Sequence, residues 1–188
     1  MYAPVKIILG SKSPRRLEIL SDAGFEVEVV KPKIEERFPF DMNYYKVAEY
    51  LSKLKIFDIY SYLGQDDDFI LCADTVVILD NKLIGKPKSL DQAFKFLKSL
   101  NGRSHDVVTG ISIRKNKMQI SFSELAKVHF KNLSDEEIKA YVNEFQPLDK
   151  AGAYNVQEFI GVEKVEGEFF NVMGLPLKRV QHEIKNWK

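Results

Sequence analysis

The sequence predicts an α/β fold in a single domain, residues 1–188, with an elongated mixed β-sheet flanked by helices and two lobes around one cleft. Strand and helix signals alternate along the chain, which is typical of a sheet covered by helices. Two strand signals in the middle of the chain are unusually long. With 188 residues, of which 45% are hydrophobic, the chain is large enough for one such core.

The first strand and the first helix meet at a segment rich in serine and arginine. The apolar run at residues 5–9 predicts a strand, and the apolar spacing that begins at Leu17 predicts a helix. Between them lies Ser11-Lys12-Ser13-Pro14-Arg15-Arg16, where Ser13 fits an N-cap and Pro14 the first helical position. Free N–H groups at a helix start, two hydroxyls and two guanidinium groups predict an anion site, with phosphate the obvious ligand.

The next three elements follow from apolar periodicity. Residues 26–30 alternate charged residues with valine, which predicts a second strand. Residues 44–62 carry apolar side chains at helical spacing, which predicts a long helix. Residues 69–79 form a β-rich apolar run that predicts a buried strand, and Asp80-Asn81 predicts the turn after it.

Helix caps and one hairpin define the second half of the chain. Ser89 and Gln92 predict a capping box for a helix that ends near residue 100, and Ser134 with Glu137 predicts another. Residues 106–114 and 118–130 predict two strands joined by the turn Lys115-Asn116-Lys117. An apolar stripe from Leu177 onward predicts a last helix.

Asp74 interrupts the apolar strand at residues 69–79. A carboxylate in such a run is costly unless it is paired or binds a cation. One interpretation is a buried aspartate satisfied by backbone donors. The other is a general base or a metal ligand in a cleft, with Thr75 beside it.

Four further polar residues have both a structural and a functional interpretation. Lys55 lies at the edge of a helical apolar face, where lysines often extend to solvent, and Lys86 lies in the rigid loop Gly85-Lys86-Pro87. A positioned lysine there is also a point charge for phosphate. Glu36 is either part of an exposed acidic loop or a site residue. Gln157 ends a loop of small residues and could read a base edge, because an amide is both donor and acceptor.

Composition excludes several classes of protein. The net charge of +1 argues against stable nucleic-acid binding. The single cysteine, Cys72, excludes an internal disulfide and is expected to be a buried thiol. We expect a cytoplasmic protein without a membrane segment, since no signal-peptide pattern or long apolar stretch occurs. His105 is expected in a turn, and the histidines show neither metal-ligand spacing nor a cysteine partner.

Six motifs, taken in order, resemble the Maf-type nucleoside triphosphate pyrophosphatases over nearly the whole chain. They are Ser11-Lys12-Ser13-Pro14-Arg15-Arg16, Ala73-Asp74-Thr75-Val76-Val77, Gly85-Lys86-Pro87, and the stretches at residues 102–110, 149–157 and 171–176. The resemblance implies a Maf/ITPase-like fold with a central cleft. It also implies hydrolysis between the α and β phosphates with a divalent cation, usually Mg²⁺ with Mn²⁺ as an alternative, and a homodimer.

The tract at residues 150–154 with Gln157 is similar to the branch that acts on dTTP and UTP. Two alternatives stay open at this point. One is a pyrophosphatase for 7-methyl-GTP or other modified nucleotides, with a housecleaning role. The other is a non-catalytic nucleotide-binding regulator of cell division, which would keep the phosphate cradle and lose the acid and metal groups.

The resemblance assigns roles position by position. Asp74 matches the proton acceptor. The expected catalytic residues are Asp74, Lys86 and Lys55, the expected substrate-binding residues are Ser11, Arg15, Arg16, Thr75 and Gln157, and the expected metal ligands are Glu36 and Asp74. Within the substrate-binding group, Arg16 is the expected phosphate ligand, and Arg15, Thr75 and Gln157 match positions of substrate selection. The chain departs from the family pattern at Asn155 and Glu158, which replace glycines, and at Ala126, which replaces threonine.

Overall fold

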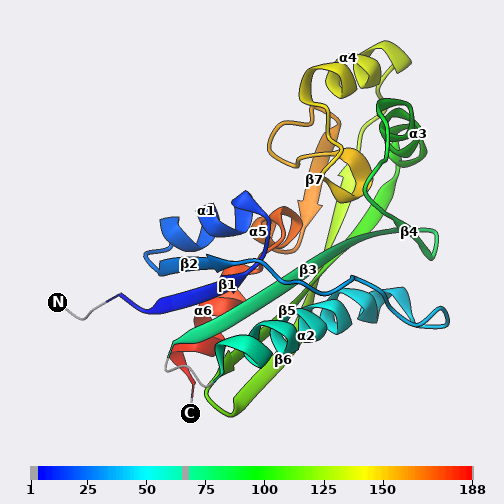
Figure 1. Ribbon diagram of the computed structural model, residues 1–188. Helices are drawn as coiled ribbons and strands as arrows, with labels where there is room; N and C mark the ends of the chain where they lie inside the picture. The colour runs from blue at the N-terminus through cyan, green and yellow to red at the C-terminus, as the bar shows by residue number, and fades with distance from the viewer. Residues whose placement is uncertain (1–3, 65–67, 188) are drawn as a thin grey trace.

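The computed structural model describes residues 4–64 and 68–187 and has the expected α/β architecture (Figure 1). The strands are β1 (Lys6–Gly10), β2 (Glu26–Val30), β3 (Phe69–Leu79), β4 (Lys82–Ile84), β5 (Ser104–Lys115), β6 (Met118–Phe130) and β7 (Val162–Glu166). The helices are α1 (Pro14–Asp22), α2 (Tyr44–Leu63), α3 (Leu90–Leu100), α4 (Asp135–Phe145), α5 (Phe169–Met173) and α6 (Leu177–Lys185), with a 3-10 turn at Ala151–Ala153.

The strands form one mixed sheet in the order β2-β1-β3-β5-β6-β7, and β4 pairs with part of β3. The pairs β1–β2 and β1–β3 are parallel, whereas β3–β5, β5–β6 and β6–β7 are antiparallel. The unit β1–α1–β2 is therefore a parallel crossover, and the long hairpin of β5 and β6 extends the sheet. This mixed topology confirms the predicted fold class.

Helix α2 packs closely against β3 and β5 (Figure 1). Gly110 in β5 makes this approach possible, because a Cβ there would lie 2.1 Å from the backbone nitrogen of Glu49. One turn further along α2, the hydroxyls of Ser52 and Ser112 lie 2.8 Å apart and join the helix to the same strand. At the far end of the long strands, α3 and α4 pack on each other.

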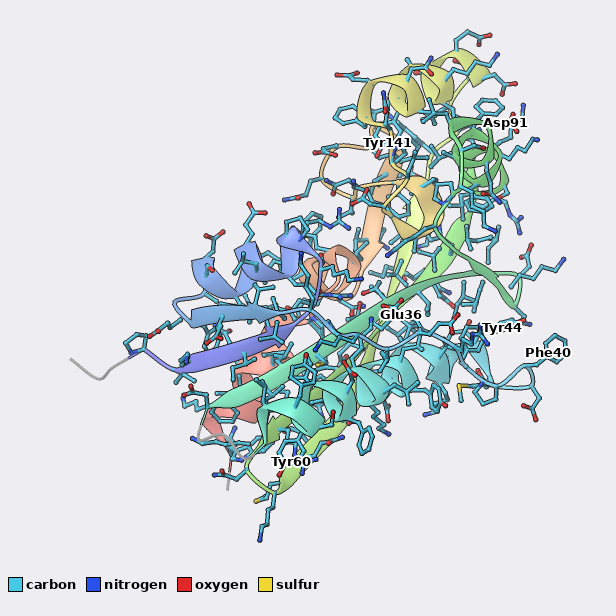
Figure 2. All side chains as sticks on the ribbon, in the orientation of Figure 1. Glu36, Phe40, Tyr44, Tyr60, Asp91 and Tyr141 are labelled. Carbon is cyan, nitrogen blue, oxygen red and sulfur yellow. The ribbon has the colours of Figure 1, made fainter. Side chains whose placement is uncertain are left out.

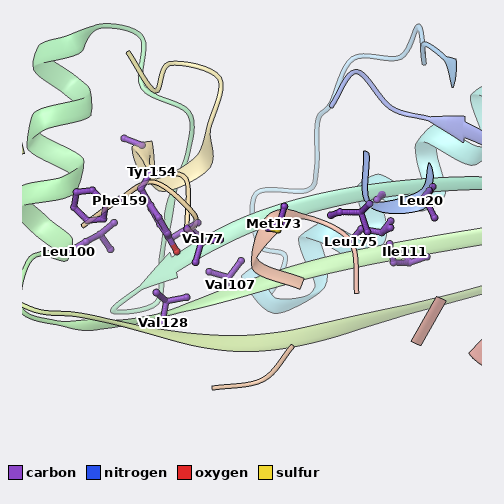
Figure 3. Close-up of a cluster of buried hydrophobic side chains, with 14 of the residues drawn as sticks. Leu20, Val77, Leu100, Val107, Ile111, Val128, Tyr154, Phe159, Met173 and Leu175 are labelled. Atoms are coloured by element: carbon purple, nitrogen blue, oxygen red, sulfur yellow. The ribbon is translucent and has the colours of Figure 1, made fainter. Parts of the chain in front are cut away.

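A single large cluster of buried side chains links the two ends of the sheet. It runs from Leu20 on α1, through Val77 and Val107 on the central strands, to Leu100 and Phe159 at the other end (Figure 3). Smaller clusters fill the space between α2 and the sheet. In residues 4–64 and 68–187 no helix is long and apolar enough to cross a membrane.

Most predicted elements are confirmed, with differences at their ends. Ser134 and Glu137 form the expected capping box. Ser13 occupies the N-cap position but its side chain makes no capping hydrogen bond, and Gln92 returns to the backbone N–H of Lys88 instead of that of Ser89. The expected turn at His105 is wrong, since His105 is a buried residue of β5. Strand β7 and helix α5 lack a strong periodic signal because both are only five residues long.

Candidate active site

A cleft of about 530 Å³ opens beside β3. Its walls come from the β1–α1 turn, the segment between β2 and α2, helix α2, the loop after β4, the loop at residues 149–156, and the end of α5. Eight of the nine predicted site residues line it: Ser11, Arg15, Arg16, Glu36, Lys55, Asp74, Thr75 and Lys86. The fold therefore gathers side chains that are separated by up to 75 positions in the sequence.

Ser11 and Arg16 form a connected unit at the start of α1. The Ser11 hydroxyl accepts hydrogen bonds from the backbone N–H of Ser13 and from Nη1 of Arg16, each at 3.1 Å. Because a hydroxyl accepts two such bonds and donates one, Ser11 can offer a ligand its O–H proton. The serine that matters for the helix start is thus Ser11, whose hydroxyl receives the N–H of Ser13.

Arg16 is buried, and protein oxygens accept hydrogen bonds from all three of its nitrogens. Nε donates to the Gly174 carbonyl at 2.8 Å, Nη1 to the Ala73 carbonyl at 2.9 Å, and Nη2 to the Thr75 hydroxyl at 3.0 Å. Burial lowers the pKa of this guanidinium. Four of its five N–H groups are thus committed within the protein, so a direct phosphate contact of Arg16 stays a prediction.

Arg15 has more freedom than Arg16. Its side chain is one-quarter exposed, and its Nη1 lies 3.9 Å from a carboxylate oxygen of Asp149 on the opposite wall. Lys150 pairs with the same carboxyl group at 2.7 Å. The exposed Lys86 also lines the cleft. The donors of Arg15 and Lys86 are thus more open to a ligand than those of the buried Arg16 and Lys55.

Lys55 lies between two carboxylates. Its ammonium is 2.5 Å from Oδ1 of Asp74 and 3.0 Å from Oε1 of Glu36, and it also donates to the Ala73 carbonyl at 3.3 Å. The Lys55 and Asp74 side chains are 6% and 12% exposed, so this is a buried ion pair. The interpretation of Lys55 as a solvent-reaching lysine is wrong, and Asp74 has a charged partner instead of backbone donors alone.

Glu36 interacts electrostatically with the cations of the cleft. It lies on the segment between β2 and α2, centrally along the molecule, whereas Phe40 on the same segment lies near Tyr44 at the start of α2 (Figure 2). Burial acts to raise the pKa of Glu36, but the charges of Lys55, Lys86 and Arg16 outweigh it and leave the pKa below its usual value. Glu36 is therefore a carboxylate near neutral pH although it stands beside a cleft.

The carboxylates of Glu36 and Asp74 are the donors available for a metal ion. Both lie within 3.0 Å of one ammonium nitrogen, so they face a common point. Among the described residues no group of three or more His, Cys, Asp or Glu side chains could hold a metal. Mg²⁺ in phosphate-transfer sites is bound by one or two carboxylates with phosphates and waters, and this pair fits that donor set.

Gln157 is the predicted site residue that the structure keeps apart from the cleft. Its side chain is exposed and does not line the cavity, although its backbone N–H binds the Asn155 side chain at 3.2 Å. The same loop instead contributes Tyr154 and Asn155, which the sequence reasoning missed. The small residues of this loop indicated a possible binding loop. An irregular loop has no periodicity, however, so the sequence does not show which of its side chains point into the cleft.

Two tyrosines fix this loop. The Tyr141 hydroxyl accepts the backbone N–H of Asn155 at 2.9 Å, and the Tyr154 hydroxyl lies 2.8 Å from Nε2 of His105. Burial raises the pKa of both tyrosines, to about 12 for Tyr141. Both hydroxyls are therefore neutral at physiological pH and act as hydrogen-bonding groups.

The chain is similar to known proteins over nearly its whole length. The family model described as "Maf-like protein" matches residues 6–187. A dTTP/UTP pyrophosphatase of Bacteroides thetaiotaomicron is 42% identical over 184 residues, which cover 96% of this chain and 95% of the relative. Proteins of the same name from Porphyromonas gingivalis strain W83 and Thermosipho africanus are 43% and 46% identical, over 97% and 94% of this chain and 94% and 90% of their own. This chain belongs to the Maf-like protein family.

Proposed function

We propose that this chain is a nucleoside triphosphate pyrophosphatase that hydrolyses dTTP and UTP to the monophosphate and pyrophosphate. Full-length relatives that carry this name support the substrate class. The observation that carries the reaction is the buried Asp74–Lys55 pair, with the half-exposed Glu36 on the same ammonium, in one cleft with Ser11, Arg15 and Lys86. Phosphoryl chemistry depends mainly on positioning and charge neutralisation, and this cleft supplies both acids and cations for it.

In this proposal Asp74 accepts a proton from the attacking water. Lys55 fixes the direction of the Asp74 carboxylate and of Glu36, since both are hydrogen-bonded to its ammonium. Lys86 and Arg15 balance the charge of the triphosphate, and Ser11 donates its O–H to a phosphate oxygen. Arg16 and Thr75 also line the cleft. The role of Gln157 in base selection, which the family resemblance implies, stays a prediction, because its side chain does not line the cavity.

The family also implies a divalent cation, Mg²⁺ or Mn²⁺, which Glu36 and Asp74 would hold together with the phosphates. When bound, such an ion neutralises phosphate charge and lowers the pKa of water. The chain itself contributes the carboxylates of Glu36 and Asp74, which Lys55 holds close together. Glu36→Gln should therefore raise the Mg²⁺ concentration needed for half-maximal activity by roughly tenfold, whereas the exposed Glu35→Gln should leave it unchanged.

A substrate panel with Mg²⁺ tests the activity. dTTP, UTP, CTP and 7-methyl-GTP are offered separately, and the monophosphate and pyrophosphate are both measured. We expect equal amounts of the two products and the highest kcat/KM with dTTP and UTP. A preference for 7-methyl-GTP would overturn the assigned branch, and no release from any nucleotide would favour a binding protein.

Asp74→Asn tests the catalytic assignment in the same assay. Loss of a general base reduces kcat by roughly 10²- to 10⁴-fold. The matched control is Asp91→Asn, which changes an exposed aspartate on α3 that pairs with Lys95 one turn away. Circular dichroism establishes that both variants are folded. Full activity in folded Asp74→Asn would remove Asp74 from the mechanism.

A homodimer, as the family resemblance implies, is part of the same proposal. Light scattering after size-exclusion chromatography should give twice the mass of one chain at micromolar concentration. A fully active monomer would contradict the proposed dimer and would show that hydrolysis does not require dimerisation.

A further inference from the structure

A line of hydrogen bonds leads from the cleft to the backbone of α5. Nη2 of Arg16 donates to Thr75 Oγ1 at 3.0 Å, Thr75 Oγ1 lies 2.9 Å from Thr109 Oγ1, and Thr109 Oγ1 donates to the Asn171 carbonyl at 2.8 Å. Thr75 lines the cleft, whereas Thr109 and Asn171 are fully buried behind it. The line thus connects a cleft residue to two residues that no ligand in the cleft touches.

Elementary hydrogen-bond chemistry fixes the direction of every proton in this line. A guanidinium only donates, a carbonyl oxygen only accepts, and a hydroxyl has a single proton. The Thr109 proton goes to the Asn171 carbonyl, so it is not available for Thr75. The bond between the two threonines therefore runs from the Thr75 O–H to the Thr109 oxygen.

The consequence for the cleft is chemical. The Thr75 oxygen accepts a hydrogen bond from Arg16, and its O–H donates one to Thr109, so only a lone pair of the oxygen is left for a ligand. Thr75 can accept from an N–H or O–H of a ligand and cannot donate to a phosphate oxygen. Among pyrimidines, thymine and uracil carry a hydrogen on N3, whereas N3 of cytosine is an acceptor.

The residue that follows α5, Gly174, also binds the Arg16 guanidinium. The Gly174 carbonyl accepts from Nε of Arg16 at 2.8 Å. Gly174 has φ of 107°, and a Cβ there would lie 3.3 Å from both Arg16 Nε and Thr75 Oγ1. Asn171 is in turn fixed to β5, because its side-chain amide donates to the Val107 carbonyl at 3.2 Å. The α5 segment is thus linked to the Arg16 guanidinium in two ways. The Gly174 carbonyl binds it directly, and the Asn171 carbonyl is linked to it through Thr109 and Thr75.

We propose that Thr109 is a positioning residue that makes Thr75 an acceptor and thereby favours substrates whose base presents a hydrogen on N3 to it. This rests on the proposed function, because it concerns the choice among pyrimidine nucleotides. Thr109→Val keeps the shape of the side chain and removes the hydroxyl. The Thr75 proton then loses its acceptor and becomes available to a ligand, which weakens the preference for uracil over cytosine.

The test compares kcat/KM for UTP and CTP in matched variants. We expect Thr109→Val to narrow the ratio of UTP to CTP at least fivefold, and Thr109→Ser, which retains the hydroxyl, to restore it. The control is Ser112→Ala, which removes another fully buried hydroxyl of β5, bonded at 2.8 and 2.9 Å to Ser52 and Ser121 away from the cleft. It should alter stability and leave the ratio unchanged.

Two results would overturn the proposal. One is an unchanged UTP-to-CTP ratio in folded Thr109→Val. The other is a Thr75→Val, Thr109→Val double variant that narrows the ratio further than Thr75→Val alone, because Thr109 acts only through Thr75. The double variant should therefore match the single Thr75→Val variant within about twofold.

A measurement without substrate separates this proposal from the proposed function. The hydroxyl proton of Thr75, assigned in a proton spectrum by its absence in Thr75→Val, reports the hydrogen bond from Thr75 to Thr109. Thr109→Val should speed its exchange with water at least fivefold, and Thr109→Ser should not. If the wild-type chain hydrolyses no pyrimidine nucleotide, the proposed function fails, and an unchanged exchange rate would then refute the positioning role as well.

Discussion

Replacing Lys55 with methionine tests the central ion pair of the cleft. Methionine has nearly the length of lysine and no charge, so the change removes the ammonium and leaves the packing largely intact. Asp74, whose side chain is only 12% exposed, then keeps a buried charge that has lost its partner. Removing one member of a buried pair costs about 3–5 kcal/mol.

Glu36 adds little to this figure. Its side chain is 53% exposed, and half-exposed ion pairs contribute at most about 1 kcal/mol. We therefore expect Lys55→Met to lower the free energy of unfolding by about 4 kcal/mol. In a protein of this size each kcal/mol corresponds to roughly 2–4 °C in the melting temperature. The control is Lys53→Met on the same helix, whose exposed pair with Glu49 is worth less than about 0.5 kcal/mol.

Urea denaturation of the apo protein in EDTA measures these differences. The double variant Lys55→Met, Asp74→Asn removes both charges and should recover about 2 kcal/mol relative to the sum of the two single changes. Such a recovery shows that the stranded carboxylate causes most of the loss. Losses that add within about 0.5 kcal/mol would refute the reasoning, since the two groups would then act independently.

Two further predictions concern packing and pH. Gly110→Ala should lower the free energy of unfolding by at least about 2 kcal/mol, because its Cβ would lie 2.1 Å from the Glu49 backbone nitrogen. The control is Gly85→Ala, whose Cβ would have nothing within 4 Å and which should change this free energy by less than about 0.5 kcal/mol. Urea denaturation measures both. Burial lowers the pKa of His105 to about 4 from its ordinary 6.5, so the unfolded chain binds more protons between these values. The free energy of unfolding should fall by about 3 kcal/mol from pH 6.5 to 4, and His105→Gln should lack this part of the acid loss. Equal stability of Gly110→Ala and wild type, or an acid loss unaltered in His105→Gln, would contradict these expectations.

The sequence by itself determined the elements and the general location of the site. Periodicity identified β3 and α2, and the capping pair Ser134–Glu137 identified the start of α4, since these signals act between residues a few positions apart. A polar interruption at Asp74 indicated a site for the same reason, because an apolar strand around a carboxylate is a local pattern.

Only the tertiary structure decided how these side chains are paired. The proximity of Lys55 to both Asp74 and Glu36 depends on how α2 lies across β3, and the pattern at Lys55 alone favoured a solvent-exposed lysine. Likewise, His105 lies in a short segment with turn-forming neighbours, and its place in β5 follows from pairing with β6.

The arginine pair also shows what the sequence could not determine. Adjacent helical residues point about 100° apart, so the sequence could not divide the roles of Arg15 and Arg16. The structure commits Arg16 to protein oxygens and leaves Arg15 the more open of the two. The contacts that do this join residues 57 to 158 positions apart, and no local periodicity encodes which distant carbonyl or hydroxyl a buried donor will meet.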